Sequence, residues 1–593
     1  MEIFPTIHPD GASYPSIEVE AHVADCMAGA IMQTRPDRDD ARDWLDRAVS
    51  LSEHLPPAVQ TGSRYFMEIY YIWFGDFSAA KASLEQFSRL RESKQWNPVT
   101  TIFFHATSAT FAWLHSELDL CRMHIGKARE LANQSGLHLW DGLIISQGVA
   151  GELLAGNLPA AEALLKEGDA ATQRLGGIHR AHFLHLVCWY KLLRGDFLEA
   201  WTQMQQSLNL LSTEGGHMFG EAAHAIVAAH ILRELGRVPE AMQCLGQVIQ
   251  TAQRMQSDLL RFGAWILTAQ LAFDRNDEAE GLEALRNALK IGEARGLMQY
   301  PGCQPDMMAA LCARALNAGI QVPFVQRMIQ KHRYLGPPEA RLVETWPWPI
   351  KIYTLGRFEV LINGQPLGKN RKTPHRLIEL LTTLITYGGA PVSPARLMDT
   401  LWPDADGDQA QENLKKSIAR LRQLLIVDDV IRWQDGEISL NGLRCWVDVW
   451  VFEAYSKEAD SRGVTGVMTH DGPEAKVAMA LYRGPFLGWN EIASWAGSYR
   501  ERVRGEFTRV FMRREKVMAG SQREQLMAEL ARAIDVDPVA EPLYHQLIPL
   551  LVATNRHAEA AAYYDRCRTE LARWASRSVS AELQSVAQTI RSR

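Results

Sequence analysis

Apolar and small residues recur in a regular pattern over residues 1–335. Short turn signals are each followed by a stretch in which apolar positions have helical spacing. Seven residues mark these turns at a step of about 40 residues, namely Asp37, Asp76, Glu117, Asn157, Asp196, Arg237 and Asp277. A constant step of this length is typical of stacked helix pairs, because one pair cannot bury its apolar stripe alone. The pattern predicts an α-solenoid over residues 1–335.

Four of the turns are followed by a small residue where the two helices of a pair would cross closely. These residues are Ala80, Ala161, Ala200 and Ala241. The stretch resembles the tetratricopeptide class, in the longer-repeat form found in MalT-like bacterial regulators. The sequence departs from those regulators in one respect, since it has no GxxxxGK[ST] motif for a nucleotide-binding module.

Proline and tryptophan interrupt the helical pattern at residues 336–349. Pro337-Pro338 and Trp346-Pro347-Trp348-Pro349 cannot continue a helix, because proline lacks the N–H donor and restricts the residue before it. We expect a short, stiff linker here, with the two tryptophans docked against a neighbouring domain.

The period of the apolar pattern changes to two after the linker. Phe358, Val360 and Ile362 alternate with their neighbours, and Asn363-Gly364 follows them. This pattern predicts a strand that enters a tight turn. Asp435-Gly436 gives the same hairpin signal later in the chain.

Helical spacing returns between the two hairpin signals. It predicts a helix at about 377–385, a short helix from Ser393 through Leu401, and a third helix at about 409–425. Strands, three helices and a hairpin form the element order of a winged helix-turn-helix, which we place at residues 350–442. Residues 446–593 are expected to be helical from Trp446 onward.

One face of the third predicted helix carries apolar residues and the opposite face carries polar ones. The apolar stripe consists of Leu414, Ile418, Leu421 and Leu425. The polar face consists of Gln409, Glu412, Asn413, Lys416 and Arg420. Arginine, lysine and side-chain amides are suited to base edges in a major groove, and glutamate can accept from cytosine. We therefore expect this face to read DNA bases, although an ordinary solvated helix face has the same composition.

Cations flank this helix and precede it. Residues 351–376 contain six cations and one acid. We expect six residues to contact DNA, either at its phosphates or from the hairpin wing. They are Lys415, Arg422, Arg396, Lys372, Arg432 and Trp433. The net charge of −6 argues against a bulk nucleic-acid coat but is compatible with one local basic surface.

The motifs of residues 346–593 resemble the SARP/AfsR class of bacterial activators. They are Tyr353-Thr354-Leu355-Gly356-Arg357-Phe358, Gly388-Gly389-Ala390-Pro391-Val392-Ser393, Leu401-Trp402-Pro403-Asp404, Trp446-Val447-Asp448-Val449-Trp450, Leu481-Tyr482-Arg483-Gly484-Pro485-Phe486-Leu487 and Asp537-Pro538. The resemblance implies an OmpR/PhoB-type winged helix followed by a bacterial transcriptional activation domain at 446–593. It implies that the third helix enters the major groove of promoter DNA, with direct repeats as the site architecture.

The same resemblance implies RNA polymerase as a partner. The loop at 403–408, with Asp404, Asp406 and Asp408, and the activation domain are expected to contact it. No phospho-acceptor receiver domain precedes the winged helix, and Ala575–Ser580 departs from the family's usual Gly- and Pro-containing turn. The expected location is the bacterial cytoplasm, at the nucleoid when DNA is bound.

Enzyme motifs are missing from the sequence, so we expect neither catalysis nor a cofactor. No GxSxG or HExxH pattern occurs. The eight cysteines include no CxxC pair and are interpreted as buried hydrophobic residues in a reducing compartment. His182 and His185 lie on an apolar helix and are interpreted as structural instead of as metal ligands. No apolar run approaches the roughly 18 residues of a membrane span.

Two functions from different classes follow from these patterns. The first is a mainly α, DNA-binding transcription activator whose solenoid senses a small-molecule or protein inducer on its concave face, with self-association as one response. The second is a non-catalytic scaffold with a degenerate winged helix. Asn413, Lys416 and Arg420 favour the first, because a degenerate module would tend to replace them with apolar or acidic residues.

Overall fold

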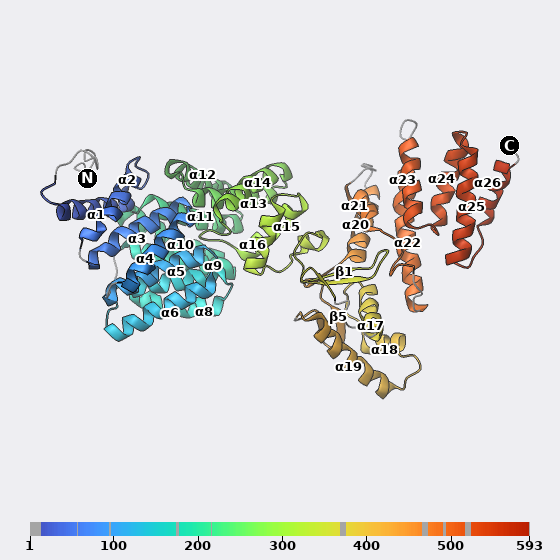
Figure 1. The fold of residues 1–593 in the computed structure, drawn as a ribbon, viewed down its shortest axis with the longest axis horizontal. Helices are drawn as coiled ribbons and strands as arrows, with labels where there is room; N and C mark the ends of the chain where they lie inside the picture. Colours follow the sequence, from blue (N-terminus) through green and yellow to red (C-terminus); the bar gives the residue numbers. More distant parts are fainter. Residues whose placement is uncertain are drawn as a thin grey trace. The chain divides into compact units, whose positions relative to one another are not determined.

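The computed structural model describes most of the chain. The described residues are 14–55, 57–93, 97–172, 177–214, 216–367, 375–427, 429–464, 473–489, 494–515 and 523–591. The protein is mainly helical and divides into two compact units, unit 1 (Met1–Tyr334) and unit 2 (Leu335–Arg593) (Figure 1). The prediction of a mainly helical protein with a tetratricopeptide-like solenoid is confirmed. None of the described helices is both long and apolar enough to cross a bilayer.

Unit 1 is built from helix pairs. The pairs are α1 (Ile17–Thr34) with α2 (Ala41–Leu51), α3 (Pro57–Phe74) with α4 (Phe77–Ser93), α5 (Pro98–Leu114) with α6 (Leu118–Ser135), α7 (Asp141–Leu154) with α8 (Leu158–Thr172), α9 (Gly177–Arg194) with α10 (Phe197–Glu214), α11 (Met218–Glu234) with α12 (Val238–Met255), α13 (Asp258–Asp274) with α14 (Glu278–Arg295), and α15 (Pro305–Asn317) with α16 (Val322–His332). Each of the seven turn markers lies between the two helices of its pair. The short 3₁₀ turn η1 (Ser52–His54) follows α2.

The recurring turn signal has a local physical cause. A glycine in the left-handed conformation ends the first helix of several pairs, as at Gly75 and Gly195, with φ of 84° and 85°. In the pairs α3/α4 and α13/α14, an acidic residue caps the second helix. Asp76 Oδ1 accepts from the N–H of Ala79 at 3.0 Å, and Asp277 Oδ1 accepts from that of Glu280 at 3.0 Å.

The odd-numbered helices form the inner wall of the solenoid. Successive members from α1 to α13 contact one another, and α3 also contacts α13, so the superhelix closes on itself within unit 1. Trp73 on α3 stacks on Phe219 of α11 with ring centroids 4.8 Å apart. Consecutive residues 144–154 of α7 and 222–232 of α11 are buried without interruption. These stretches of α7 and α11 are therefore enclosed on all sides by described residues.

Unit 2 contains a small sheet and a hairpin. The sheet order is β3 (Gln365–Pro366), β2 (Glu359–Ile362), β1 (Ile350–Tyr353) and β6 (Cys445–Val447). β1 pairs antiparallel with β2 and parallel with β6. The separate hairpin consists of β4 (Ile431–Gln434) and β5 (Glu437–Leu440). Both predicted turns have two positive-φ residues, at Asn363-Gly364 and Asp435-Gly436, as a two-residue hairpin loop requires.

Three helices lie between the sheet strands and the hairpin in the sequence. They are α17 (His375–Thr386), α18 (Pro394–Leu401) and α19 (Gly407–Leu425), close to their predicted bounds. In the described part of the chain after β6, the helices are α20 (Asp448–Val464), α21 (Pro473–Leu481), α22 (Ser494–Glu515), α23 (Arg523–Val536), α24 (Glu541–Ala553), α25 (His557–Trp574) and α26 (Ala581–Arg591). Helix α22 contacts both α20 and α24. In the described residues, the helices after β6 thus form one connected array.

One expectation about this region is wrong. The chain does not become helical at Trp446, because Cys445–Val447 forms β6 and the helix starts at Asp448. Parallel pairing with β1 depends on a strand almost a hundred residues earlier, which no local pattern reveals.

The Pro/Trp segment at 336–349 lies within unit 2. It includes the 3₁₀ helix η2 (Pro338–Leu342), and both tryptophan side chains are buried. The Trp348 indole donates to the Val343 carbonyl oxygen at 3.0 Å. One hydrophobic cluster extends from Ile350 through the strands and α17–α19 to Leu583. The strand-and-hairpin region and the C-terminal helices therefore share a core.

Candidate nucleic-acid interface

Helix α19 buries its apolar stripe and exposes its polar face. Leu414, Ile418, Leu421 and Leu425 belong to the shared core of unit 2. Asp406 begins the helix, because its carboxylate accepts from the N–H of Gln409 at 2.8 Å. The predicted periodicity is thus the observed one, and packing on the core fixes which side of α19 faces solvent.

The polar residues of α19 form two pairs along the helix. Gln409 Nε2 donates to Asn413 Oδ1 at 3.0 Å, and Lys416 Nζ lies 2.6 Å from Glu412 Oε1. The hydrogen bond from Lys416 lowers the pKa of the Glu412 carboxyl. Such exposed pairs between residues four apart are weak and exchange readily for other partners.

Two exposed cations of α19 have no partner in the described part of the chain. Arg420 lies on the polar face, one turn after Lys416, and Lys415 lies beside that face. Neither forms a hydrogen bond or ion pair with a described residue. Both groups are therefore available to an anion or to a hydrogen-bond acceptor from outside the protein.

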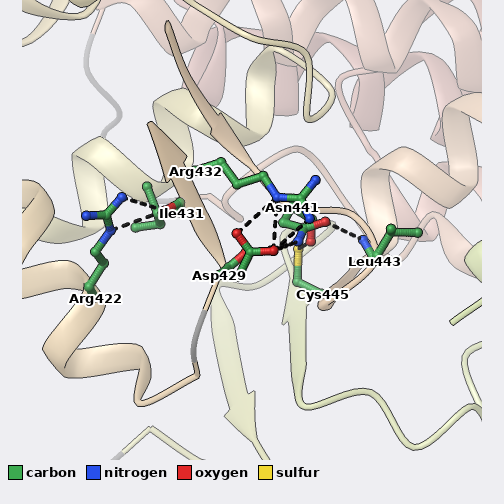
Figure 2. A network of polar contacts seen from close by, with 7 residues as sticks. All are labelled: Arg422, Asp429, Ile431, Arg432, Asn441, Leu443 and Cys445. Carbon is green, nitrogen blue, oxygen red and sulfur yellow. Dashed lines mark hydrogen bonds and ion pairs between the residues drawn. The ribbon is translucent and has the colours of Figure 1, made fainter. Parts of the chain in front are cut away.

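The hairpin is fixed to α19 by Arg422. Its Nε and Nη2 donate to the Ile431 carbonyl oxygen at 3.1 and 2.7 Å (Figure 2). Arg432 forms a hydrogen-bonded ion pair with Asp429, with Nη2 2.6 Å from Oδ2. The ion pair lowers the pKa of the Asp429 carboxyl. Arg422 and Arg432 therefore hold the hairpin in place with the same guanidinium groups that sequence reasoning assigned to DNA phosphates and to the wing.

Asn441 connects the base of the hairpin to the sheet. Its Nδ2 donates to the carbonyl and carboxylate oxygens of Asp429 at 2.9 and 3.0 Å (Figure 2). Its Oδ1 accepts from the N–H of Leu443 at 3.0 Å, and its carbonyl oxygen accepts from the Cys445 thiol at 3.2 Å. This partly buried network orients the hairpin relative to β6.

Trp433 projects from the hairpin. Trp433 is 36% exposed; Trp574 on α25, at 43%, is the other exposed indole among the described residues of unit 2. An exposed indole beside cations is a surface for stacking or for contact with a sugar and phosphate backbone.

The remaining predicted cations have different surroundings. Arg396 is exposed and lies over the Tyr387 ring at 5.2 Å. Burial lowers the pKa of Lys351 on β1, and Arg357 pairs with Glu359 at 2.9 Å. Lys372, like Lys369 and Arg371, lies outside the described residues.

The loop expected to contact a polymerase precedes α19. Asp404 is exposed in this loop. Asp408, which was expected in the loop, is exposed in the first turn of α19, because the helix starts at Gly407. Asp406 is also exposed, but its carboxylate already caps the helix.

A buried joint connects the sheet to the C-terminal helices. The Asp448 carboxylate accepts from the N–H and hydroxyl of Thr354 and from the N–H groups of Leu355 and Val449, at 2.7–3.0 Å. Gly356 follows Leu355 in the chain and has a φ of 80°. A Cβ there would lie 2.3 Å from the Arg483 carbonyl oxygen, so only glycine allows this approach.

Several other motif residues complete this architecture. Asp537 Oδ2 accepts from the Tyr482 hydroxyl at 2.6 Å and from Arg504 Nε at 2.8 Å. The backbone N–H of Ser580 donates to Glu541 Oε1 at 2.7 Å, which holds the segment before α26. The motifs that carry the family resemblance are thus mainly structural, and sequence reasoning missed the role of Asp448.

The described residues contain no group of three His, Cys, Asp or Glu side chains arranged to hold a metal ion. His185 is buried, and its ring centroid lies 4.4 Å from that of His224.

Comparisons with known proteins bear on the second half of the chain. Residues 447–591 match the family model of the bacterial transcriptional activator domain. This match indicates a transcriptional activator family for the part of the chain that it covers. No curated protein sequence matches the chain.

Three solved structures resemble parts of the chain. One is EmbR of Mycobacterium tuberculosis in complex with a low-affinity phosphopeptide. It is 21% identical to this chain, with a TM-score of 0.30, and the match covers 41% of this chain and 65% of EmbR. A Rap protein complexed with competence and sporulation factor is 13% identical over 55% of this chain and 89% of that one, with a TM-score of 0.43. The apo quorum sensor NprR from B. thuringiensis is 9% identical over 79% of this chain and 99% of that one, with a TM-score of 0.28.

Proposed function

We propose that the protein is a sequence-specific DNA-binding transcription regulator that activates by recruiting RNA polymerase. The observation that carries this proposal is the exposed polar face of α19, fixed beside a braced hairpin with an exposed indole. We assign residues 350–442 to an OmpR/PhoB-type winged helix, 446–593 to a transcriptional activation domain and 1–335 to a sensor solenoid, with 336–349 between them.

Base reading is assigned to the polar face of α19. Arg420 and Lys416 donate to guanine O6 and N7, and Asn413 and Gln409 pair with the N6 and N7 atoms of adenine. Glu412 accepts from cytosine N4. The pairs within the helix are compatible with this assignment, because they are exposed and weak, so these side chains can exchange their partners for base edges.

Phosphate contacts are assigned to the residues that flank this face. Lys415 and Arg396 are exposed and point to no carboxylate of the described residues, so they are suited to the DNA backbone. Arg422 has guanidinium hydrogens left after its bonds to Ile431. Arg432, Trp433 and Lys372 are assigned to the same backbone or to the neighbouring minor groove.

Activation is assigned to the C-terminal helices and to the loop before α19. The family match at 447–591 supports this assignment. Asp404 and Asp408 supply exposed carboxylates for the polymerase, with Asp406 beside them. The hydrogen bonds of Asp448 support a coordinated placement of the winged helix and the activation domain, because they connect the sheet of the winged helix directly to α20.

The test is selection of bound sequences from random duplex DNA by the full-length protein at two salt concentrations. We expect enrichment of a short motif that includes direct repeats. Salt-sensitive binding without enrichment would contradict base reading, because phosphate contacts alone carry no sequence information. No binding by the full-length protein would favour the scaffold.

A further inference from the structure

A pocket lies between the two helices of the seventh pair in unit 1. Asp258 and Trp265 are two turns apart on one face of α13. Asn287, Lys290 and Ala294 follow one another along one face of α14. These two faces line a pocket of about 600 Å³. This volume is within the range of sites that hold small molecules.

The regular stacking of unit 1 changes at this pair. In the preceding pairs each inner helix packs on the next inner helix, as α9 does on α11 and α11 does on α13. Helix α13 packs on α3, whereas the following pair packs on α14. The described residues that line the pocket come from α13 and α14. The groove of this pair therefore stays open to solvent.

The acidic residue of the pocket is already paired. Asp258 is 8% exposed, and its Oδ2 lies 2.7 Å from Arg295 Nε. Its Oδ1 lies 2.9 Å from Arg261 Nη2. Two guanidinium groups thus share one carboxylate, so a positive charge remains at this end of the pocket. A cationic ligand would have to displace an arginine from Asp258.

The other polar groups of the pocket are mainly hydrogen-bond donors. Lys290 offers its ammonium group, Trp265 its indole N–H and Asn287 its side-chain amide. None of these three side chains has a polar partner among the described residues. Arg295 also keeps the hydrogens of its two Nη atoms after its bond to Asp258. The pocket therefore presents positive charge and unused donors to an anion.

Apolar surface lies beside these donors. The Trp265 ring is half-buried, and Ile291 and Ala294 of α14 line the same pocket. A partly exposed indole offers its face for stacking on another ring. Apolar walls with a few converging polar groups are typical of small-molecule sites. A flat ring that carries a negative charge uses both kinds of surface.

We propose that the groove between α13 and α14 binds a small aromatic carboxylate. The ring of the ligand packs on Trp265 and Ile291, and its carboxylate accepts from Lys290 and Arg295. Asn287 adds a hydrogen bond from its amide. This inference rests on the sensing role proposed for unit 1, and it names the site and the ligand class. Because binding to this groove requires no DNA, the two proposals fail separately.

The experiment measures binding of 2-naphthoate to the full-length protein by calorimetry in the absence of DNA. We expect saturable binding with a Kd below about 1 mM. The matched control is 2-naphthamide, which has the same rings without the charge. It should bind at least about tenfold more weakly, because it cannot form the ion pairs with Lys290 and Arg295.

Variants locate the site. Lys290→Gln removes the exposed ammonium group, and Trp265→Leu removes the ring but keeps an apolar side chain. Each should weaken binding of 2-naphthoate at least about tenfold, whereas Lys290→Arg keeps the charge and should restore most of the affinity. Lys127→Gln, which removes an exposed cation of α6 outside the pocket, should bind like the natural protein.

Thermal unfolding checks that each variant is folded. If Trp265→Leu is unfolded, Lys290→Gln decides, because Lys290 is exposed and has no partner to lose among the described residues. The proposal is overturned if the natural protein does not bind 2-naphthoate or binds the amide equally well. It is also overturned if folded Lys290→Gln keeps the natural affinity, or if Lys127→Gln loses as much. A failed DNA selection would leave all these affinities unchanged.

Discussion

Asp448 accepts two hydrogen bonds from Thr354, one from its backbone N–H at 2.8 Å and one from its hydroxyl at 2.7 Å. The two residues are 94 positions apart, yet this contact holds the first strand of the sheet to the first C-terminal helix. Leu487 adds to the joint by donating its N–H to the Thr354 carbonyl oxygen at 2.6 Å. The joint is where a change in the C-terminal helices would reach the sheet.

Replacing Asp448 should destabilise unit 2. Asp448→Asn places an amide donor against N–H groups of Thr354, Leu355 and Val449, which leaves donors unpaired in the core. We expect a loss of at least about 2 kcal/mol in the free energy of unfolding, measured with urea. Thr354→Val removes a single hydroxyl and should cost about 1 kcal/mol. Equal losses in the two variants would contradict the central role of the carboxylate.

Replacing Arg420 should reduce discrimination between DNA sequences. Arg420→Ala removes a fork-shaped donor that is suited to guanine O6 and N7. We expect a loss of about 1–3 kcal/mol in binding to the selected site and a relaxed preference at one position. Fluorescence anisotropy with single-base variants of the site measures both. Lys416→Ala should act in the same way at a neighbouring position. Unchanged affinity and preference would remove these residues from the reading face.

Replacing Lys415 should have a different signature. Lys415→Ala removes a charge assigned to a phosphate, so binding to all sequences should weaken to a similar extent. The slope of log K against log salt concentration should fall by about one unit. A loss confined to one sequence would show that Lys415 reads a base instead.

The structural role of Arg422 can be distinguished by experiment from the role of residues that only contact DNA. Because it donates twice to the Ile431 carbonyl oxygen, Arg422→Ala should displace the hairpin even without DNA. We expect faster hydrogen exchange in β4 and β5 and a loss of about 1–2 kcal/mol in stability. Arg396→Ala, which removes no hydrogen bond to the hairpin, is the control. Equal exchange in Arg422→Ala and the natural protein would limit Arg422 to a phosphate role.

Unit 1 should lose stability in acid. Burial lowers the pKa of His185, His224 and His230, and that of His230 to about 3. An unfolded histidine titrates near about 6.5, so the unfolded chain takes up protons first as the pH falls. The stabilisation is present above about pH 6.5 and is lost as the pH falls through the folded pKa values.

Urea unfolding followed by tryptophan fluorescence at several pH values measures this loss. Each titrating histidine adds up to about 1.4 kcal/mol per pH unit to the slope. His230→Gln keeps a hydrogen-bonding group near Tyr300 and should show a smaller slope than the natural protein. An unchanged slope would contradict the assignment of the acid sensitivity to His230.

The local features of the fold could be predicted from the sequence. Gly75-Asp76 predicts the turn between α3 and α4, because the left-handed glycine and the capping acid are local requirements. The stripe from Leu414 to Leu425 likewise identified the buried side of α19. The exposure of Arg420 and Lys416 follows from the same helical period.

Features that depend on distant partners could not be predicted. The segment Cys445–Val447 is too short to show a period in its apolar pattern. It is a strand because it pairs in parallel with β1. The burial of Gln299 depends on Trp113, 186 residues earlier. Arg422 and Arg432 have the composition expected of DNA contacts, but only the folded hairpin reveals their bonds to Ile431 and Asp429.

The central claim is that the polar face of α19 reads DNA sequence. Its most direct test is the ratio of affinities for the selected site and for a scrambled duplex, measured at one salt concentration. The Asn413/Lys416/Arg420 triple alanine variant is compared with the natural protein and with an Arg523/Gln525/Arg532 triple alanine variant on α23. The account predicts that the ratio falls towards one only in the α19 variant, with the free energy of unfolding unchanged. A ratio that stays at its natural value in the α19 variant would contradict the account.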